Sequence, residues 1–114
     1  MKISQPVPEL PVPDVVEAQR HYRDQFGFRI DWYNEEGRIG AVSCGDCAIF
    51  FRAPSKPLHP SVFWVFTEEL DQTFAEVSKL GAGIVDPPSD KPWGLRQFTL
   101  RDRYGNIFHF HHDI

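Results

Sequence analysis

The chain has 114 residues, of which 41% are hydrophobic and 14% aromatic, and 12 basic against 16 acidic side chains give a formal net charge of −4. This length fits one domain with a real hydrophobic core, at about 100–200 residues per domain. The negative charge argues against a nucleic-acid partner and is compatible with a cationic ligand. No apolar run approaches the ~20 residues that span a bilayer, and no secretory signal is visible. We therefore expect no membrane partner and a cytoplasmic location.

The first half of the sequence predicts a strand, a helix and three more strands. Residues 7–12 are expected to be extended, and the prolines at 8, 11 and 13 limit the strand to a sheet edge or to a short piece. Asp14 is a good helix N-cap, and Gly27 is the expected C-terminal stop. The apolar stripe between them has helical spacing and comprises Val15, Ala18, Tyr22 and Phe26. The strands that follow are expected at 28–33, 39–44 and 47–52.

Cys44 and Cys47 form a CxxC pattern around Gly45-Asp46. We interpret it as a hairpin, because Gly-Asp is a two-residue turn signal and the cysteines are then strand residues that flank the turn. A zinc site needs about four ligands, and the sequence holds no second cysteine pair. A redox CxxC belongs at a helix N-terminus, which is not expected here. The sequence therefore favours two free cysteines.

The second half repeats the order of the first. A Pro-rich connector at 53–61 leads to a strand at 62–67 and a helix at 68–80, which has Leu70, Phe74 and Val77 on one face. Gly81 stops this helix. Another strand begins at Ile84-Val85, and a loop is expected at 87–94. A terminal hairpin follows, with strands at 95–101 and 107–111.

A shift of 54 residues aligns the two halves, although few residues are identical. It places Asp14 on Glu68 and Gly27 on Gly81, and we interpret this as an internal βαβββ duplication with repeats 1–54 and 62–114. Each repeat is too short to close a core alone. The expected fold class is α+β: one domain over 1–114, in which the repeats pair two four-stranded mixed sheets. The concave surface between the sheets is the natural pocket.

Strict alternation in the last strand separates two faces. Phe108 and Phe110 share the face that needs a core, and His109 and His111 share the other.

The chain resembles the vicinal-oxygen-chelate superfamily of glyoxalases, extradiol dioxygenases and bleomycin resistance proteins, and is most similar to the last of these. The matching segments are VPELPVPDVVEAQRHYRDQFGF, FRIDW, FWVFTEELDQTFAEV and PWGLRQFTLRDRYGNIFHF. Pro-Trp-Gly followed by Arg-Asp-x-x-Gly-Asn is their most specific part. The resemblance implies the glyoxalase/bleomycin resistance fold and a homodimer, often with an exchanged N-terminal strand. It also implies a protein that sequesters bleomycin-type antibiotics without altering them, in clefts across the subunit boundary.

Enzymes of this superfamily hold a divalent metal at three strand positions, which the resemblance places at Val7, Val62 and His109. Two of these residues cannot ligate, and His109 alone cannot build a site. We therefore expect no metal, no cofactor, no catalytic residues and no enzymatic activity. A displaced site that uses His111 and His59 stays open.

The expected ligand is a planar aromatic cation. If Val62 and Val7 face the concavity, alternation adds Trp64, Phe66 and Glu9, and the resemblance adds Asp31, Trp32, Trp93 and His109. Tryptophan faces stack on rings and attract cations, and carboxylates steer them in. Core packing is the alternative for each tryptophan, and for Trp64 it is nearly as good.

Two other functions stay open. One is a metal-dependent glyoxalase- or dioxygenase-like enzyme of the same fold, although no nucleophile–base pair is evident. The other is a binder of a different small molecule, since a fold does not fix its ligand. Arg52, Arg96 and His109 could favour an anionic one.

Overall fold

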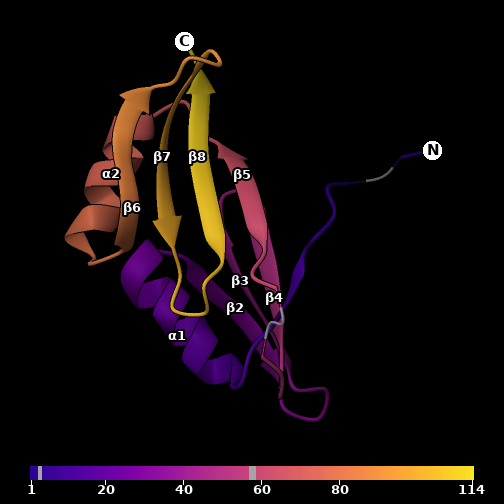
Figure 1. Ribbon diagram of the computed structural model, residues 1–114. Helices are drawn as coiled ribbons and strands as arrows, with labels where there is room; N and C mark the ends of the chain where they lie inside the picture. Colours follow the sequence, from indigo (N-terminus) through magenta and orange to yellow (C-terminus); the bar gives the residue numbers. More distant parts are fainter. Residues whose placement is uncertain (3, 57–58) are drawn as a thin grey trace. The chain divides into compact units, whose positions relative to one another are not determined.

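The computed structural model describes residues 1–2, 4–56 and 59–114. It forms two compact units, one from each half of the sequence, and each contains a helix and a four-stranded mixed sheet (Figure 1). The predicted fold class, two βαβββ units with four-stranded mixed sheets, is therefore confirmed.

The first unit has the sheet order β1-β4-β3-β2, in which β1 runs parallel to β4 and the other pairs are antiparallel. Its elements are β1 (Glu9–Pro11), α1 (Val15–Phe26), β2 (Arg29–Asn34), β3 (Ile39–Cys44) and β4 (Cys47–Arg52). The Pro-rich β1 lies at the sheet edge, as the sequence predicts, because an edge strand does not need every backbone N–H.

The second unit has the equivalent order β5-β8-β7-β6, again with one parallel pair, β5 and β8. Its elements are β5 (Val62–Phe66), α2 (Leu70–Lys79), β6 (Gly83–Asp90), β7 (Leu95–Arg101) and β8 (Ile107–Asp113). The two units therefore share one strand order.

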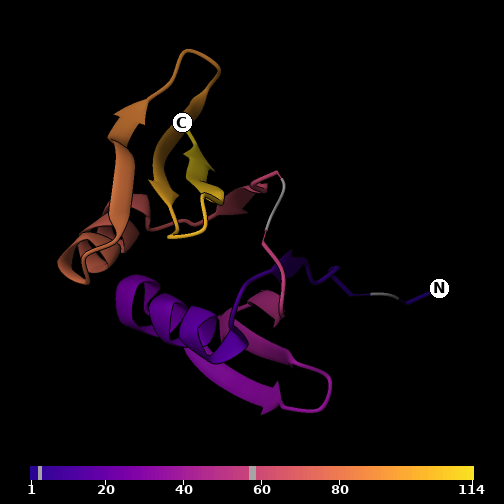
Figure 2. The ribbon, with the colours of Figure 1, turned by 60° about the horizontal axis from the view of Figure 1, so that its bottom comes forward.

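Helix α1 begins and packs as its sequence indicates (Figure 2). The backbone N–H of Glu17 donates to Asp14 Oδ1 at 2.9 Å, which caps the first turn. The predicted stripe is buried, and its central ring, Tyr22, meets Phe51 of β4 at a centroid distance of 4.9 Å. The apolar face of the helix therefore covers the first sheet.

A buried glutamine on α1 reaches into the first sheet. Gln19 is 2% exposed, and its Nε2 donates to the carbonyl oxygens of Trp32 at 2.8 Å and Ala41 at 3.1 Å. Gly40 makes room for it, since a Cβ there would lie 2.7 Å from both Gln19 Nε2 and Val15 Cγ1. Sequence reasoning did not find this contact, which fixes the helix at one position along the sheet.

The second core uses aromatic rings on one face of the sheet. Helix α2 packs against β6, β7 and β8 (Figure 1). Its Phe74 meets Phe98 of β7 at 5.4 Å, and Phe98 stacks on Phe110 of β8 at 5.0 Å. Phe63 of β5 lies 5.0 Å from Phe108, so the predicted inward face of β8 is confirmed. Below, "the open face" means the opposite side of this sheet.

The turn between β7 and β8 is held by a buried Asp–Asn pair. Asp102 accepts hydrogen bonds from the backbone N–H groups of Tyr104 and Asn106, at 2.9 and 2.8 Å. Asn106 Nδ2 donates to Asp102 Oδ2 at 2.8 Å, and its Oδ1 accepts from the backbone N–H of Ser61 at 2.9 Å. Gly105 has φ +90°, which favours glycine. The Arg-Asp-x-x-Gly-Asn motif thus connects this turn to the start of β5.

Several predicted boundaries were wrong. The loop expected at 87–94 is shorter, because β6 continues to Asp90. Its prolines are tolerated because β6 is an edge strand whose register shifts between Ile84 and Ser89. The last strand runs on to Asp113, beyond the expected 111. The helix expected at 68–80 begins only at Leu70, and Glu69 makes no side-chain cap bond.

The Cys44–Cys47 hairpin is as predicted. The two cysteines are direct partners across β3 and β4, and Gly45 has φ +56° in the turn. Both thiols are free. None of the helices in the described part of the chain is long and apolar enough to cross a membrane.

Candidate functional site

The open face of the second sheet carries exposed aromatic rings. Along β5 exposure alternates: Val62, Trp64 and Phe66 are 56%, 53% and 59% exposed, while Phe63 and Val65 lie on the side of α2. The predicted alternation is therefore confirmed. Large apolar side chains gathered at a surface usually mark an interaction site.

Two histidines of β8 lie beside these rings. His109 is the register partner of Trp64, and the ring centroids are 4.3 Å apart at an interplanar angle of 34°. His111 pairs with Phe66 and meets its ring at 6.1 Å. The Nδ1 atom of His111 is buried without a hydrogen-bond partner among the described residues. β8 thus places two imidazoles against the aromatic side chains of β5.

The polar side chains of Gln97 and Thr99 on β7 continue the open face, and we call these two residues the polar floor. Gln97 and Thr99 are only 4% and 5% exposed, and they are the register partners of His111 and His109. Thr99 Oγ1 lies 2.7 Å from His109 Nδ1, which fixes the orientation of the ring. Burial lowers the pKa of His109, and the negative charge of Asp86 partly opposes this. His109 is therefore predominantly neutral near pH 7.

Trp93 joins the same face from the turn that links β6 and β7. Its indole Nε1 donates to Gln97 Oε1 at 3.0 Å, and the residue is 60% exposed. Gly94 continues the turn with φ +89°, and its N–H donates to the carbonyl of Lys91 at 3.1 Å. A loop residue far from β5 in sequence is thereby linked to the polar floor of the open face.

A β-bulge places Trp32 on the face of the first sheet away from α1. The register shifts between Ile30 and Trp32, so Asp31 is the extra residue and Trp32 pairs with Ala41. Simple alternation would put Trp32 on the side of Ile30; the bulge turns it to the other side. There its ring meets Phe50 of β4 at 5.1 Å.

The carboxylates predicted to attract a cation each have a basic partner. Glu9 accepts from Arg52 Nε at 2.7 Å, and Asp31 accepts from Arg29 Nε at 2.8 Å. Hydrogen bonds from Ser43 and Arg29 hold the pKa of Asp31 below its ordinary value. The Asp31 carboxylate is therefore charged at neutral pH. The guanidinium groups beside Glu9 and Asp31 offset the attraction of these side chains for a cation.

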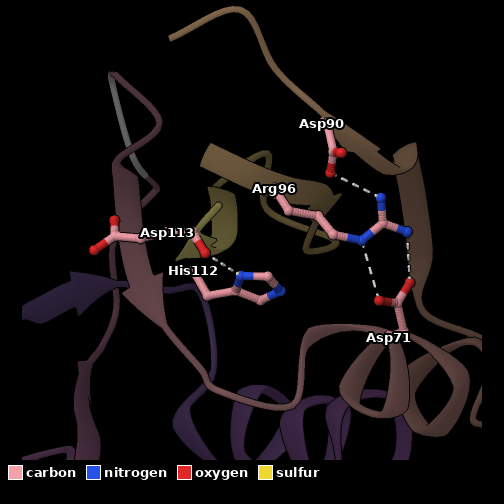
Figure 3. A network of polar contacts seen from close by, with 5 residues as sticks. All are labelled: Asp71, Asp90, Arg96, His112 and Asp113. Carbon is pink, nitrogen blue, oxygen red and sulfur yellow. Dashed lines mark hydrogen bonds and ion pairs between the residues drawn. The ribbon is translucent and has the colours of Figure 1, made fainter. Parts of the chain in front are cut away.

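The guanidinium groups considered for an anionic ligand are likewise occupied. Arg52 faces Glu9, as above. Arg96 lies on the side of α2, where its NH2 group is 2.9 Å from Asp71 Oδ1 and its NH1 group is 3.1 Å from Asp90 Oδ1 (Figure 3). Hydrogen bonds from Arg96 lower the pKa of Asp71. This cluster ties α2 to the ends of β6 and β7 and lies on the other side of the sheet from the aromatic rings.

The residues at the family's metal positions do not fit a metal ion. The side chains of Val7 and Val62 have no donor atom, and Nδ1 of His109 is engaged by Thr99. No group of three or more His, Cys, Asp or Glu residues suited to a metal is found in the part of the chain that the structure describes. A displaced centre built from His59, His109 and His111 is not among such groups there.

The structure brings together four of the seven predicted site residues: Trp64, Phe66, Trp93 and His109 share the open face of the second sheet. The other three, Glu9, Asp31 and Trp32, belong to the first unit. Sequence reasoning missed Gln97 as a member of the face. Alternation along β7 could have found it, because Phe98 and Leu100 face the core and Gln97, one position earlier, must face the other side.

Comparisons with known proteins agree with this architecture. Residues 3–110 match the family model described as the Glyoxalase/Bleomycin resistance protein/Dioxygenase superfamily. No curated protein matches the chain.

Solved structures with a similar fold include TioX from Micromonospora sp. ML1, which is 25% identical, has a TM-score of 0.80, and is matched over 97% of this chain and 100% of its own. A bleomycin-binding protein complexed with bleomycin is 18% identical, with a TM-score of 0.81 and coverage of 98% and 100%. UcmS2 is 20% identical, with a TM-score of 0.76 and coverage of 97% and 98%. The βαβββ units and the match over residues 3–110 together establish that this chain belongs to the Glyoxalase/Bleomycin resistance protein/Dioxygenase superfamily.

Proposed function

We propose that this chain is a non-catalytic protein that binds and sequesters a planar, cationic aromatic molecule of the bleomycin type and so confers resistance to it. The observation that carries the proposal is the open face of the second sheet. Three aromatic residues more than half exposed, Trp64, Phe66 and Trp93, lie there with a buried polar floor. Such rings offer large, rigid contact surfaces to a flat ligand.

The expected recognition combines stacking with cation–π attraction. An indole face attracts a cation by about 0.5–2 kcal/mol, depending on how far the cation is desolvated. The net charge of −4 attracts cations at longer range. Asp86 near this face pairs with Lys91 at 2.6 Å, so we assign the local attraction to the rings rather than to a carboxylate.

Two further observations support the proposal. A bleomycin-binding protein complexed with bleomycin has the same fold, at a TM-score of 0.81, so the scaffold can accommodate such a ligand in that protein. The aliphatic side chains of Val7 and Val62 at the family's metal positions favour binding without catalysis. We also propose that the protein acts as a homodimer in which a second copy completes a cleft around the ligand.

The test is a tryptophan fluorescence titration of the purified protein with bleomycin and a panel of other planar molecules, cationic and anionic. We expect bleomycin to change the emission in a saturable manner. If another aromatic molecule saturates the response and bleomycin does not, the ligand is that kind of molecule rather than bleomycin. No response to any of them would contradict the binding function. Elemental analysis completes the test: stoichiometric zinc, iron or manganese that is lost in His109→Ala would favour a metal-dependent enzyme.

A further inference from the structure

Gln97 is an unusual residue for the middle of a sheet. It lies on β7 between His111 of β8 and Ser89 of β6, and it is 4% exposed. A buried amide is costly unless both of its ends find partners. Its hydrogen bonds therefore indicate what the residue does.

The orientation of the Gln97 amide follows from its one partner. An indole N–H can only donate, so the group that faces Trp93 Nε1 at 3.0 Å must be the Gln97 oxygen. The amide nitrogen is then directed elsewhere. It makes no hydrogen bond to a residue that the structure describes, and it is not among the wholly enclosed, unpartnered atoms. The amide nitrogen of this 4% exposed residue thus keeps a small accessible surface on the open face.

The direction of the Trp93 ring depends on the same hydrogen bond. Its ring is mostly exposed, and the bond to Gln97 is the polar contact that the structure gives its side chain. The backbone of the turn is fixed separately, by hydrogen bonds between Lys91 N and Leu95 O at 2.7 Å and between Gly94 N and Lys91 O at 3.1 Å. The side-chain bond therefore sets the direction of the ring rather than the shape of the turn.

We propose that Gln97 has two roles in the binding function proposed above, on which this inference rests. Its oxygen positions Trp93 beside the polar floor, and its amide nitrogen donates to a hydrogen-bond acceptor on the edge of the bound ring. The preferred ligand is accordingly a planar heteroaromatic molecule with a carbonyl oxygen or ring nitrogen at its edge, rather than a plain aromatic cation. Gln97 is both a positioning and a specificity-determining residue.

The positioning role can be measured without any ligand. In NMR spectra the indole N–H signal of Trp93 is identified by its loss in Trp93→Phe. We expect Gln97→Met, which is similar in size but has no amide, to speed exchange of this proton with solvent and to shift its signal. The matched control is Gln72→Met on the surface of α2, which should change neither. Unchanged exchange in a folded Gln97→Met variant would overturn the positioning role.

The specificity role is tested by calorimetry with bleomycin in a double-mutant cycle of Trp93→Phe and Gln97→Met. One ordinary hydrogen bond corresponds to about two- to tenfold in affinity. We expect Gln97→Met to weaken binding further in the Trp93→Phe background, by about that factor. If Gln97→Met causes no further loss of affinity in the Trp93→Phe background, the amide nitrogen does not donate to the ligand. Gln97 would then have the positioning role alone.

The two proposals fail in different ways. If the wild-type protein binds no bleomycin and no other planar molecule, the proposed function fails, and the donor role fails with it. The exchange measurement still reports on the bond between Trp93 and Gln97. If the wild type binds and Gln97→Met causes no loss of affinity in the cycle, the proposed function stands and the donor role of Gln97 is wrong.

Discussion

Trp64 lies in the middle of β5 with 53% of its surface exposed and its ring against His109 at 4.3 Å. Full truncation of a buried aromatic residue costs about 3–5 kcal/mol. We expect Trp64→Ala to lower the free energy of unfolding by clearly less, about 1–2 kcal/mol, because half of the residue contacts no protein. Phe98→Ala is the control, since Phe98 is 0% exposed and should show the full cost. Urea denaturation measures both, and equal losses would mean that Trp64 is a core residue.

His109 makes stability depend on pH. Burial lowers its pKa in the folded protein below the ordinary 6.5, so the unfolded chain binds a proton more readily. The contribution of His109 to the free energy of unfolding is therefore fully present above pH 6.5. It is lost as the pH falls from 6.5 through the pKa of His109 in the folded protein. We expect His109→Gln to reduce this loss in denaturation experiments above and below that value. The exposed His59→Gln is the control, and an unchanged pH dependence in His109→Gln would contradict the assignment.

Gln19 connects α1 to the first sheet. Gln19→Met keeps the size of the side chain but leaves the carbonyl oxygens of Trp32 and Ala41 without this donor. We expect a loss of about 1–3 kcal/mol in the free energy of unfolding, the usual cost of buried polar groups left unsatisfied. The same substitution at the exposed Gln72 should cost little. Equal losses in the free energy of unfolding for the two variants would show that the buried hydrogen bonds of Gln19 do not stabilise the fold.

The elements themselves could largely be predicted from the sequence. Asp14 and the stripe around Tyr22 determine α1, and the alternation of Val62, Trp64 and Phe66 was enough to orient β5. These features are local, since capping and periodicity depend on neighbours in the chain. Strand β6 was harder, because its prolines argue against a strand unless one knows that it lies at a sheet edge.

The parts of the site that could not be predicted depend on non-local contacts. The bulge at Asp31 reverses the side of Trp32, and a bulge leaves no clear signal in a single sequence. The pairs of Glu9 with Arg52 and of Trp93 with Gln97 require knowledge of which strands are neighbours. Sequence reasoning could therefore name aromatic residues for the site but not the partners that orient them or offset their charge.

The family and the short β1 lead us to expect a homodimer. β1 has only three residues, at the edge of its sheet, and relatives of this kind are expected to complete their clefts with a second chain. Light scattering or sedimentation at micromolar concentration should give about twice the mass of 13.2 kDa. A monomer under these conditions would remove the shared cleft from the proposed function.

The proposed function requires that the open face of the second sheet binds a planar cationic ring. Calorimetry with bleomycin, for the wild type and Trp93→Ala at low and high salt, tests it most directly. Loss of about 0.5–2 kcal/mol of stacking should weaken binding several-fold to tens-fold with little change in stability, and binding should weaken as salt rises. Wild-type binding that Trp93→Ala leaves unchanged would place the ligand elsewhere, and no wild-type binding would contradict the bleomycin assignment.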